Sequence, residues 1–387
     1  YYPYRQNSDL FYLTGTDQEE TILLFFPDCP LEQYREVLFI RKTNDRIATW
    51  EGHKYTQEEA SEISGIKNVM WTESFEDVMT QAATLSSNIY LNRNEHWGAP
   101  QVPESREVRE GKKLKERYPF HQFHRLAPLL TELRLIKDKA EIDTMRHACK
   151  ITAKAFERTA RFVKPGLNEF QVEAEITHEF LRSGAKGHAY APIVASGKNA
   201  TVLHYIDNNS VLKDGDLILF DIGCEFENYS SDLSRTIPVN GKFTKRQREV
   251  YDAVLRVFKQ ARDMIRPGIT IDQINKKVET LLMEEHIRLG LYKEEDVMEK
   301  DEAQKLVKAY YPHGTSHFMG LDVHDVGTKY ERLEAGMVLS CEPGIYIRKE
   351  NIGIRLENDI LVTNGDPVDL MEEIPVEAED IEKLMSK

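Results

Sequence analysis

Acidic side chains at the ends of apolar segments are the residues of this sequence best suited to chemistry. Asp221 follows the apolar run Leu217–Phe220, and Asp232 lies eleven residues further on. A turn at residues 227–228 would fold this stretch into a hairpin and place the two carboxylates side by side. Two adjacent buried carboxylates repel each other unless a cation lies between them. Taken alone, the pair leaves an alternative open, in which Asp232 lies in an exposed turn and Asp221 is hydrogen-bonded to the backbone.

A second pair of acids follows the same pattern later in the chain. Glu342 ends the mostly apolar stretch 337–341, and Glu357 lies just before the apolar run Ile360–Val362. A hairpin between them would point both acids inward, where His317 could join them. Four carboxylates and one imidazole form a donor set rich in oxygen, which suits Mn²⁺ or a similar divalent ion. Five such ligands exceed the needs of one catalytic ion, so we expect two ions bridged by carboxylates.

Three of the other histidines are candidates for binding substrate. His313 lies four residues before His317, and His324 lies seven residues after it. Together with His204, these imidazoles could bind substrate carbonyls and exchange protons near neutral pH. The remaining eight histidines have no such surroundings, and we expect structural roles for them: His53, His96, His121, His124, His147, His178, His188 and His286.

Two pairs of helices must position these side chains. Apolar residues at helical spacing predict a helix over residues 139–163, which ends at the strong breaker Lys164–Gly166. Asn168 is a suitable N-cap for a second helix that ends near Gly184. The same order returns later, with a helix that begins at Thr244, a Pro-Gly stop at residues 267–268 and a further helix over residues 271–282.

Glycines around the acids repeat as well. Gly215 precedes Asp221 by six residues, and Gly336 precedes Glu342 by six residues. We interpret the two segments as diverged copies of one helix–helix–strand unit, although chance similarity of common patterns is an alternative. Two such halves facing each other would bring both acids to a shared central cleft.

The first third of the chain has a different pattern. Strand-like runs at residues 21–26, 37–41 and 88–91 alternate with polar, Glu-rich stretches such as residues 56–64. This alternation favours a small α/β domain. A chain of 387 residues is also longer than one core usually organises. We therefore expect an N-terminal domain over residues 1–130 and a catalytic domain over residues 131–387.

Composition restricts the partners and the compartment. The net charge is −14, and an acidic chain repels the backbone of nucleic acids, so we expect no nucleic-acid partner. The sequence has no apolar run long enough for a membrane span, and we expect no membrane partner. Its four cysteines form no CxxC pair, which favours a reducing cytoplasm over disulfides or a thiolate zinc site. The chain starts at Tyr1 rather than Met, so we expect an opening segment to be absent.

Four segments around the candidate residues resemble the metal-binding core of the pita-bread metallopeptidases, the group of aminopeptidase P, prolidase and methionine aminopeptidase. They are HGTSHFMGLDVHDVG (313–327), FDIGCEFENYSSDLSRTIPVNGKF (220–243), CEPGIY (341–346) and GIRLENDILVT (353–363). The segment YRQNSDLFYLTG (4–15) resembles the N-terminal domain of aminopeptidase P. The resemblance implies an α+β protein: a small α/β domain of the creatinase and aminopeptidase P type, then a pita-bread domain with two pseudo-twofold related halves.

The resemblance also implies roles for individual residues. Two divalent metal ions, with Mn²⁺ expected, would be held by five ligands: Asp221, Asp232, His317, Glu342 and Glu357. Catalytic roles would fall to Glu342 as the proton shuttle, to His324, His313 and His204 as contacts of substrate, and to Arg355 near the carboxylates. Tyr346 would lie beside the site. Asn358 departs from the family, which often has an acid there, but this is not a ligand position.

The implied activity is that of a metal-dependent aminopeptidase P. Such an exopeptidase releases the N-terminal residue of a peptide with proline in second position, using a hydroxide held between the two ions to attack the Xaa-Pro bond. Its partners would be Xaa-Pro peptides and further copies of itself in a homodimer or homotetramer. Three alternatives stay open: a prolidase cleaving Xaa-Pro dipeptides with the same ligands, a non-catalytic binding protein of this fold, and a metal-free hydrolase resembling creatinase.

Overall fold

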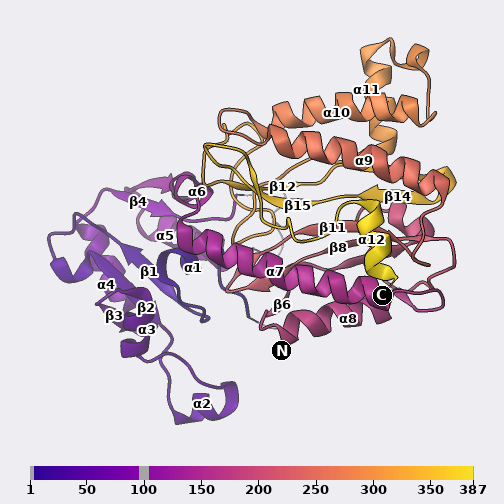
Figure 1. Cartoon of the computed structure of the whole chain (residues 1–387). Helices are drawn as coiled ribbons and strands as arrows, with labels where there is room; N and C mark the ends of the chain where they lie inside the picture. The colour runs from indigo at the N-terminus through magenta and orange to yellow at the C-terminus, as the bar shows by residue number, and fades with distance from the viewer. Residues whose placement is uncertain (1–3, 96–103, 387) are drawn as a thin grey trace. The chain divides into compact units, whose positions relative to one another are not determined.

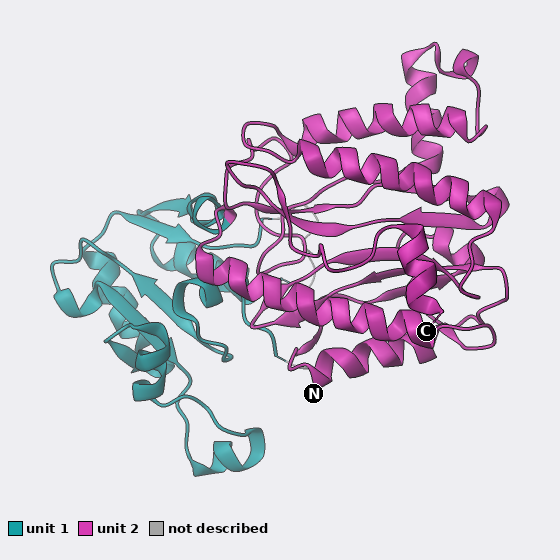
Figure 2. Cartoon of the chain, viewed as in Figure 1, with its two compact units in different colours: residues 1–134 teal, residues 135–387 magenta. Residues whose placement is uncertain are grey.

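The computed structural model describes residues 4–95 and 104–386, so His96 lies outside the described residues. The chain divides into two compact units, Tyr1–Arg134 and Leu135–Lys387, which Figure 2 colours separately. The predicted division into domains at residue 130 stays a prediction. Among the described residues, no helix is both long enough and apolar enough to span a membrane.

Unit 1 contains two small sheets. β1 (Ile22–Phe25) pairs antiparallel with β2 (Glu36–Ile40), which pairs parallel with β3 (Val69–Trp71). β4 (Asn88–Leu91) and β5 (Gln122–Arg125) form a parallel pair. α1 (Ser8–Thr14) precedes the strands, α6 (Ala127–Leu135) follows them, and the helices between them are α2 (Asp45–Glu51), α3 (Gln57–Ser64), α4 (Phe75–Thr84) and α5 (Arg106–Arg117).

The core of unit 1 explains why residues 37–40 of β2 are a continuous apolar run. Successive side chains of a strand point to opposite faces of the sheet. In β2, Leu38 and Ile40 pack with Ala60 of α3, whereas Val37 and Phe39 pack with Val78 of α4. Both faces of β2 are therefore covered by helices, as the predicted alternation of strands and helices requires.

Unit 2 begins with the predicted pairs of helices. α7 (Lys139–Phe162) starts at Asp138, which forms a capping box with Glu141, and α8 (Glu169–Arg182) follows the break at Pro165-Gly166. α9 (Lys245–Met264) and α10 (Ile271–Arg288) start at capping boxes of Thr244 and Thr270. Each Pro-Gly pair lies between two helices because proline cannot continue a helix and glycine accepts positive φ.

The strands of each half follow one order. In the first half, β8 (Leu217–Ile222) lies between β7 (Ile193–Ser196) and β11 (Leu233–Pro238), and the hairpin β9 (Cys224–Phe226) and β10 (Tyr229–Ser230) is inserted before β11. In the second half, β12 (Val338–Cys341) pairs with β15 (Asn358–Leu361) around the hairpin β13 (Gly344–Ile347) and β14 (Ile352–Arg355).

Helix, helix, strand, hairpin and strand thus recur in both halves, which confirms the predicted duplication. The halves join where Ser234 of β11 bridges Glu357, just before β15. In Figure 1 the strands of unit 2 lie between α9 and α10 on one side and α7 and α8 on the other. The remaining elements are β6 (Gly187–His188), β16 (Val368–Asp369), α11 (Lys300–Tyr310), α12 (Ala378–Met385) and short 3₁₀ helices, η1 (Glu32–Tyr34), η2 (Thr72–Ser74), η3 (Gly197–Thr201), η4 (Glu294–Val297) and η5 (Arg348–Glu350).

Candidate active site

The first pair of acids meets as the hairpin prediction requires. Asp221 lies on β8, and Asp232 directly precedes β11, the strand that pairs with β8. The turn between them falls at Glu227 and Asn228, both with positive φ. The hydroxyl of Tyr190 shares its one proton between Oδ1 of Asp221 at 2.8 Å and Oδ1 of Asp232 at 2.5 Å. Asp232 is only 5% exposed, so the alternative that placed it in an exposed turn is wrong.

The second pair of acids and His317 join this cluster. Asp232, His317 and Glu357 each offer a ligand atom, and these atoms lie within 4.8 Å of one another. His317 Nε2 lies 3.5 Å from Asp232 Oδ2 and 3.6 Å from Glu342 Oε1. The structure therefore brings together all five predicted ligands, with Asp221 connected to the rest through the shared hydroxyl of Tyr190.

Backbone contacts orient His317 for this position. Its Nδ1 donates to the carbonyl of Phe318 at 3.1 Å, which turns Nε2 towards the carboxylates. Its backbone N–H donates to Ser340 Oγ on β12, and the Ser340 hydroxyl lies 3.5 Å from Glu342 Oε1. One serine on β12 therefore connects the histidine with the acid at the end of that strand.

Arg355 is the buried cation among these acids. Its Nη2 donates to Asp221 Oδ2 at 2.5 Å, its Nε donates to Ser234 Oγ at 2.7 Å, and its Nη1 donates to Tyr346 Oη at 2.9 Å. The Ser234 hydroxyl in turn donates to Glu357 Oε2 at 2.6 Å. One guanidinium thus orients an acid from each half of unit 2.

The three histidines predicted to bind substrate differ in how closely they contact this cluster. His313 donates through Nδ1 to the Gly314 carbonyl, and its Nε2 lies 2.8 Å from the hydroxyl of Tyr346. The ring of His324 lies 4.3 Å from that of His317. His204 is exposed in the loop after η3, and it is close enough to lower the pKa of His313.

Burial gives these groups unusual protonation. Burial raises the pKa of Glu342 to about 7, although His317 and Arg355 oppose the rise. Burial and neighbouring acids raise the pKa of Glu357 well above its usual range. Burial alone would lower the pKa of His317, but its hydrogen bond to Asp232 and the charge of Glu342 outweigh burial and raise it to about 9. Burial lowers the pKa of His313 to about 3, so this imidazole is neutral.

A divalent cation fits this arrangement. Four carboxylates converge, and burial raises the pKa of three of them, Asp221, Glu342 and Glu357. A cation between the carboxylates would favour their charged forms. The donors are carboxylate oxygens and one imidazole nitrogen, the set expected for a hard or borderline divalent ion rather than one that prefers thiolates.

Comparisons with known proteins agree with this site. Residues 143–364 match the model of metallopeptidase family M24, and residues 1–90 match the model of the aminopeptidase P N-terminal domain. The chain belongs to metallopeptidase family M24. Membership confirms the predicted resemblance and the predicted fold, an α/β N-terminal part followed by a pita-bread catalytic part.

Relatives within the family span nearly the whole chain. The Xaa-Pro aminopeptidase of Escherichia coli (strain K12) is 35% identical over 398 residues, which cover 99% of this chain and 89% of the relative. The human Xaa-Pro aminopeptidase 3 is 30% identical, and the match covers 100% of this chain and 78% of the relative. The solved structure of proline aminopeptidase P II from Yersinia pestis has a TM-score of 0.87 at 35% identity, and the match covers 100% of this chain and 91% of that structure. The structure of zinc-substituted E. coli aminopeptidase P in complex with product has a TM-score of 0.85 at 35% identity, and the match covers 100% of this chain and 90% of that structure.

Several residues that hydrogen-bond to the predicted metal ligands were not predicted from the sequence. Ser234 and Ser340 lie two residues from Asp232 and Glu342, and the period of two along a strand could have indicated them. Tyr190 has no such signal, because it comes from a separate segment between α8 and β7. The two aspartates that it joins were predicted, but the group that joins them was not.

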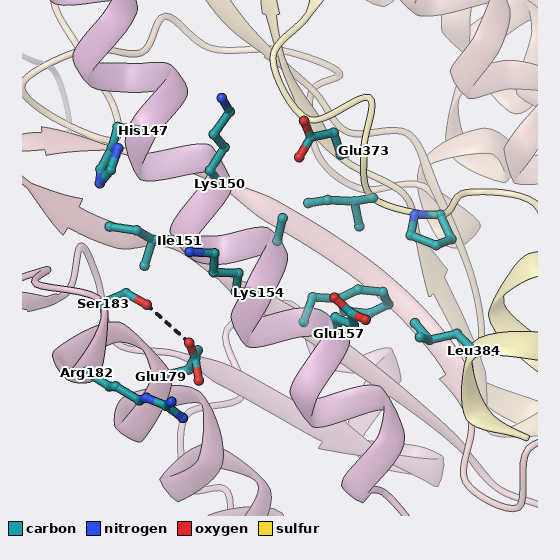
Figure 3. Close-up of a pocket in the computed structure, with 14 residues that line it drawn as sticks. His147, Lys150, Ile151, Lys154, Glu157, Glu179, Arg182, Ser183, Glu373 and Leu384 are labelled. Carbon is teal, nitrogen blue, oxygen red and sulfur yellow. Dashed lines mark hydrogen bonds between the residues drawn. The ribbon is translucent and has the colours of Figure 1, made fainter. Parts of the chain in front are cut away.

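A cavity of unit 2 lies away from these residues. This cavity of about 910 Å³ is lined by α7, α8, the segment 373–375 and Leu384 of α12. Figure 3 shows its basic and acidic side chains, with Ser183 donating to Glu179 across one side. None of the nine predicted site residues lines this cavity, so the cavity is separate from the candidate active site.

Proposed function

We propose that this chain is a metal-dependent Xaa-Pro aminopeptidase, which releases the N-terminal residue of peptides with proline in second position. The convergence of Asp232, His317 and Glu357 on one buried point carries the proposal. The relatives that span nearly the whole chain are named Xaa-Pro aminopeptidases, and this supports the substrate class. The chain is accordingly a hydrolase and a metalloprotease.

Five residues would hold the metal, which we propose to be two Mn²⁺ ions: Asp221, Asp232, His317, Glu342 and Glu357. When bound, such ions polarise a carbonyl and lower the pKa of water, so that a nucleophile is available at neutral pH. The zinc-substituted structure of the E. coli relative supports a divalent ion. The choice of Mn²⁺ rests on the oxygen-rich donor set.

The chain's own residues would handle the proton and the substrate. Cleavage of an Xaa-Pro bond must deliver a proton to the proline nitrogen, which carries no N–H in the peptide. We assign this transfer to Glu342, and its carboxylate, 3.6 Å from both His313 and His317, supports the assignment. His313, neutral and held by Tyr346, would bind a substrate carbonyl together with His204 and His324, and Arg355 would hold Asp221 in place.

The alternatives are less well supported. A prolidase has the same ligands, but residues 1–90 match the aminopeptidase P N-terminal domain and the relatives are named Xaa-Pro aminopeptidases. A non-catalytic protein would have no need of five converging ligands. We also propose a cytoplasmic homodimer or homotetramer. All four cysteines are buried and free, which supports a reducing compartment, and the family resemblance supports self-association.

One assay tests the proposed function. The chain is stripped of metal and incubated with an Xaa-Pro-Xaa tripeptide, and Mn²⁺, Co²⁺, Fe²⁺ or Zn²⁺ is then added back. We expect no hydrolysis without metal and release of the N-terminal residue with it, most rapidly with Mn²⁺. Cleavage of the Xaa-Pro dipeptide alone would show a prolidase, and equal hydrolysis by the stripped chain would contradict metal dependence.

A further inference from the structure

The buried carboxylate of Glu169, at the start of α8, accepts hydrogen bonds from several residues of one loop. The residue is fully buried. Its Oε1 accepts from the N–H and hydroxyl of Ser196 at 2.6 and 2.7 Å and from Asn199 Nδ2 at 3.1 Å. Its Oε2 accepts from Tyr205 Oη at 2.7 Å and from the N–H of Ser210 at 2.8 Å. Five donors therefore satisfy both oxygens of one carboxylate.

These donors lie on both sides of His204 along the chain. Ser196 ends β7, Asn199 lies in η3, and Tyr205 directly follows His204. Hydrogen bonds to an ionised group are stronger than those between neutral groups, and donors left unpaired in buried surroundings are costly. The carboxylate of Glu169 therefore fixes the path of the backbone through residues 196–210.

Packing connects this loop with the candidate active site. Leu203 and Tyr205, the neighbours of His204 in sequence, pack against the cluster that includes Tyr346. The hydroxyl of Tyr346 lies 2.8 Å from His313 Nε2. The position of the loop thus determines how His204 stands relative to His313.

We propose that Glu169 is a positioning residue that holds His204 beside His313 for the binding of substrate. The inference rests on the substrate contact proposed above for His204. Among the described residues, the hydrogen bonds of the Glu169 side chain go only to this loop and to none of the metal ligands. Its loss should therefore weaken the binding of peptide and leave the binding of metal unchanged.

The substitution Glu169→Gln tests the proposal in the full chain loaded with Mn²⁺. Glutamine keeps the size of the side chain, but its NH₂ group meets at least two donors at whichever oxygen it replaces. With an Xaa-Pro-Xaa tripeptide we expect KM to rise roughly tenfold and kcat to change by less than about threefold. The affinity for Mn²⁺, measured by calorimetry, should stay unchanged. Glu175→Gln is the matched control, because Glu175 lies on the same helix and pairs with Arg158.

A double substitution shows whether Glu169 acts through His204. In the His204→Ala background, Glu169→Gln should cost less than about twofold in kcat/KM. The same loss in both backgrounds, or an unchanged KM in Glu169→Gln, would overturn the inference. If Glu169→Gln does not fold, Tyr205→Phe removes one donor and should raise KM only where His204 is present. Full activity of His204→Ala would refute this inference alone, whereas a parent chain inactive on the tripeptide would refute the proposed function.

Discussion

Hydrogen bonds determine which oxygens of the aspartates face the other ligands. The hydroxyl of Tyr190 shares its one proton between Oδ1 of Asp221 and Oδ1 of Asp232, so the Oδ2 atom of Asp232 is the one that faces His317. Burial and the two aspartates raise the pKa of Tyr190 well above its usual range, so the hydroxyl keeps its proton and remains a donor. Groups that orient ligands in this way tune the affinity for metal.

Removal of this hydroxyl should weaken the binding of metal. We expect Tyr190→Phe to bind Mn²⁺ about tenfold more weakly, because both carboxylates lose the donor that orients them. Tyr229→Phe is the matched control, since the hydroxyl of Tyr229 donates to Glu141, away from the ligands. Isothermal titration calorimetry on the metal-stripped chains measures both. Equal affinities in Tyr190→Phe and the parent would show that the hydroxyl does not orient the ligands.

The elements approach one another most closely where glycine permits it. A Cβ on Gly353 would lie 1.9 Å from the carbonyl oxygen of Ala200, so β14 can pack against η3 only with glycine at this position. β14 ends at Arg355, and η3 begins the loop that carries His204. This one contact therefore sets the position of residues from both halves of unit 2.

Gly353→Ala should accordingly destabilise the chain and lower its activity. Overpacking of this kind costs about 1–3 kcal/mol, and the displaced strand carries Arg355 with it. Gly365→Ala is the control, because the nearest atom to its new Cβ is the hydroxyl oxygen of Thr363 at 3.7 Å. Unfolding in urea gives the free energy of each variant. A Gly353→Ala chain as stable and active as the parent would show that the two elements can separate without consequence.

A buried histidine of α10 should make stability depend on pH. His286 is fully buried against Tyr292 and Tyr310, and burial lowers its pKa from 6.5 to about 3. The unfolded chain therefore binds a proton between these pH values that the folded chain excludes, so stability falls as the pH drops below 6.5. At pH 5 the loss from this residue is about 2 kcal/mol.

His286→Gln should remove that part of the dependence. We expect the difference in unfolding free energy between pH 7 and pH 5 to be about 2 kcal/mol smaller in His286→Gln than in the parent. His147→Gln, which changes an exposed histidine of α7, is the control. Urea unfolding at both pH values gives these differences. Equal pH dependence in parent and His286→Gln would mean that the buried ring is protonated in the folded chain.

Across the whole molecule, local sequence patterns predicted helices and turns better than they predicted contacts between segments far apart in sequence. Pro-Gly stops and caps such as Asn168 and Thr244 are read from a few neighbouring residues, and the four helices predicted in unit 2, α7 to α10, formed where predicted. The pairing of Asp221 with Asp232 followed from one turn. Tyr190 and Glu169 could not be predicted, because their roles depend on loops far away in sequence. Asn358 accepts from Arg235 and donates to Asp369, which again only the fold reveals.

The binding of Mn²⁺ to the whole, metal-stripped chain tests the central claim most directly. Calorimetric titration of the parent should show two ions per chain, and Asp232→Asn should weaken their binding by more than about 100-fold, since it removes a carboxylate that faces His317. Asp252→Asn, which changes an acid of α9 that pairs with Arg248, should bind like the parent. Asp232→Asn that binds Mn²⁺ as tightly as the parent, or a parent that binds none, would contradict a metal site at the meeting of the four acids and His317.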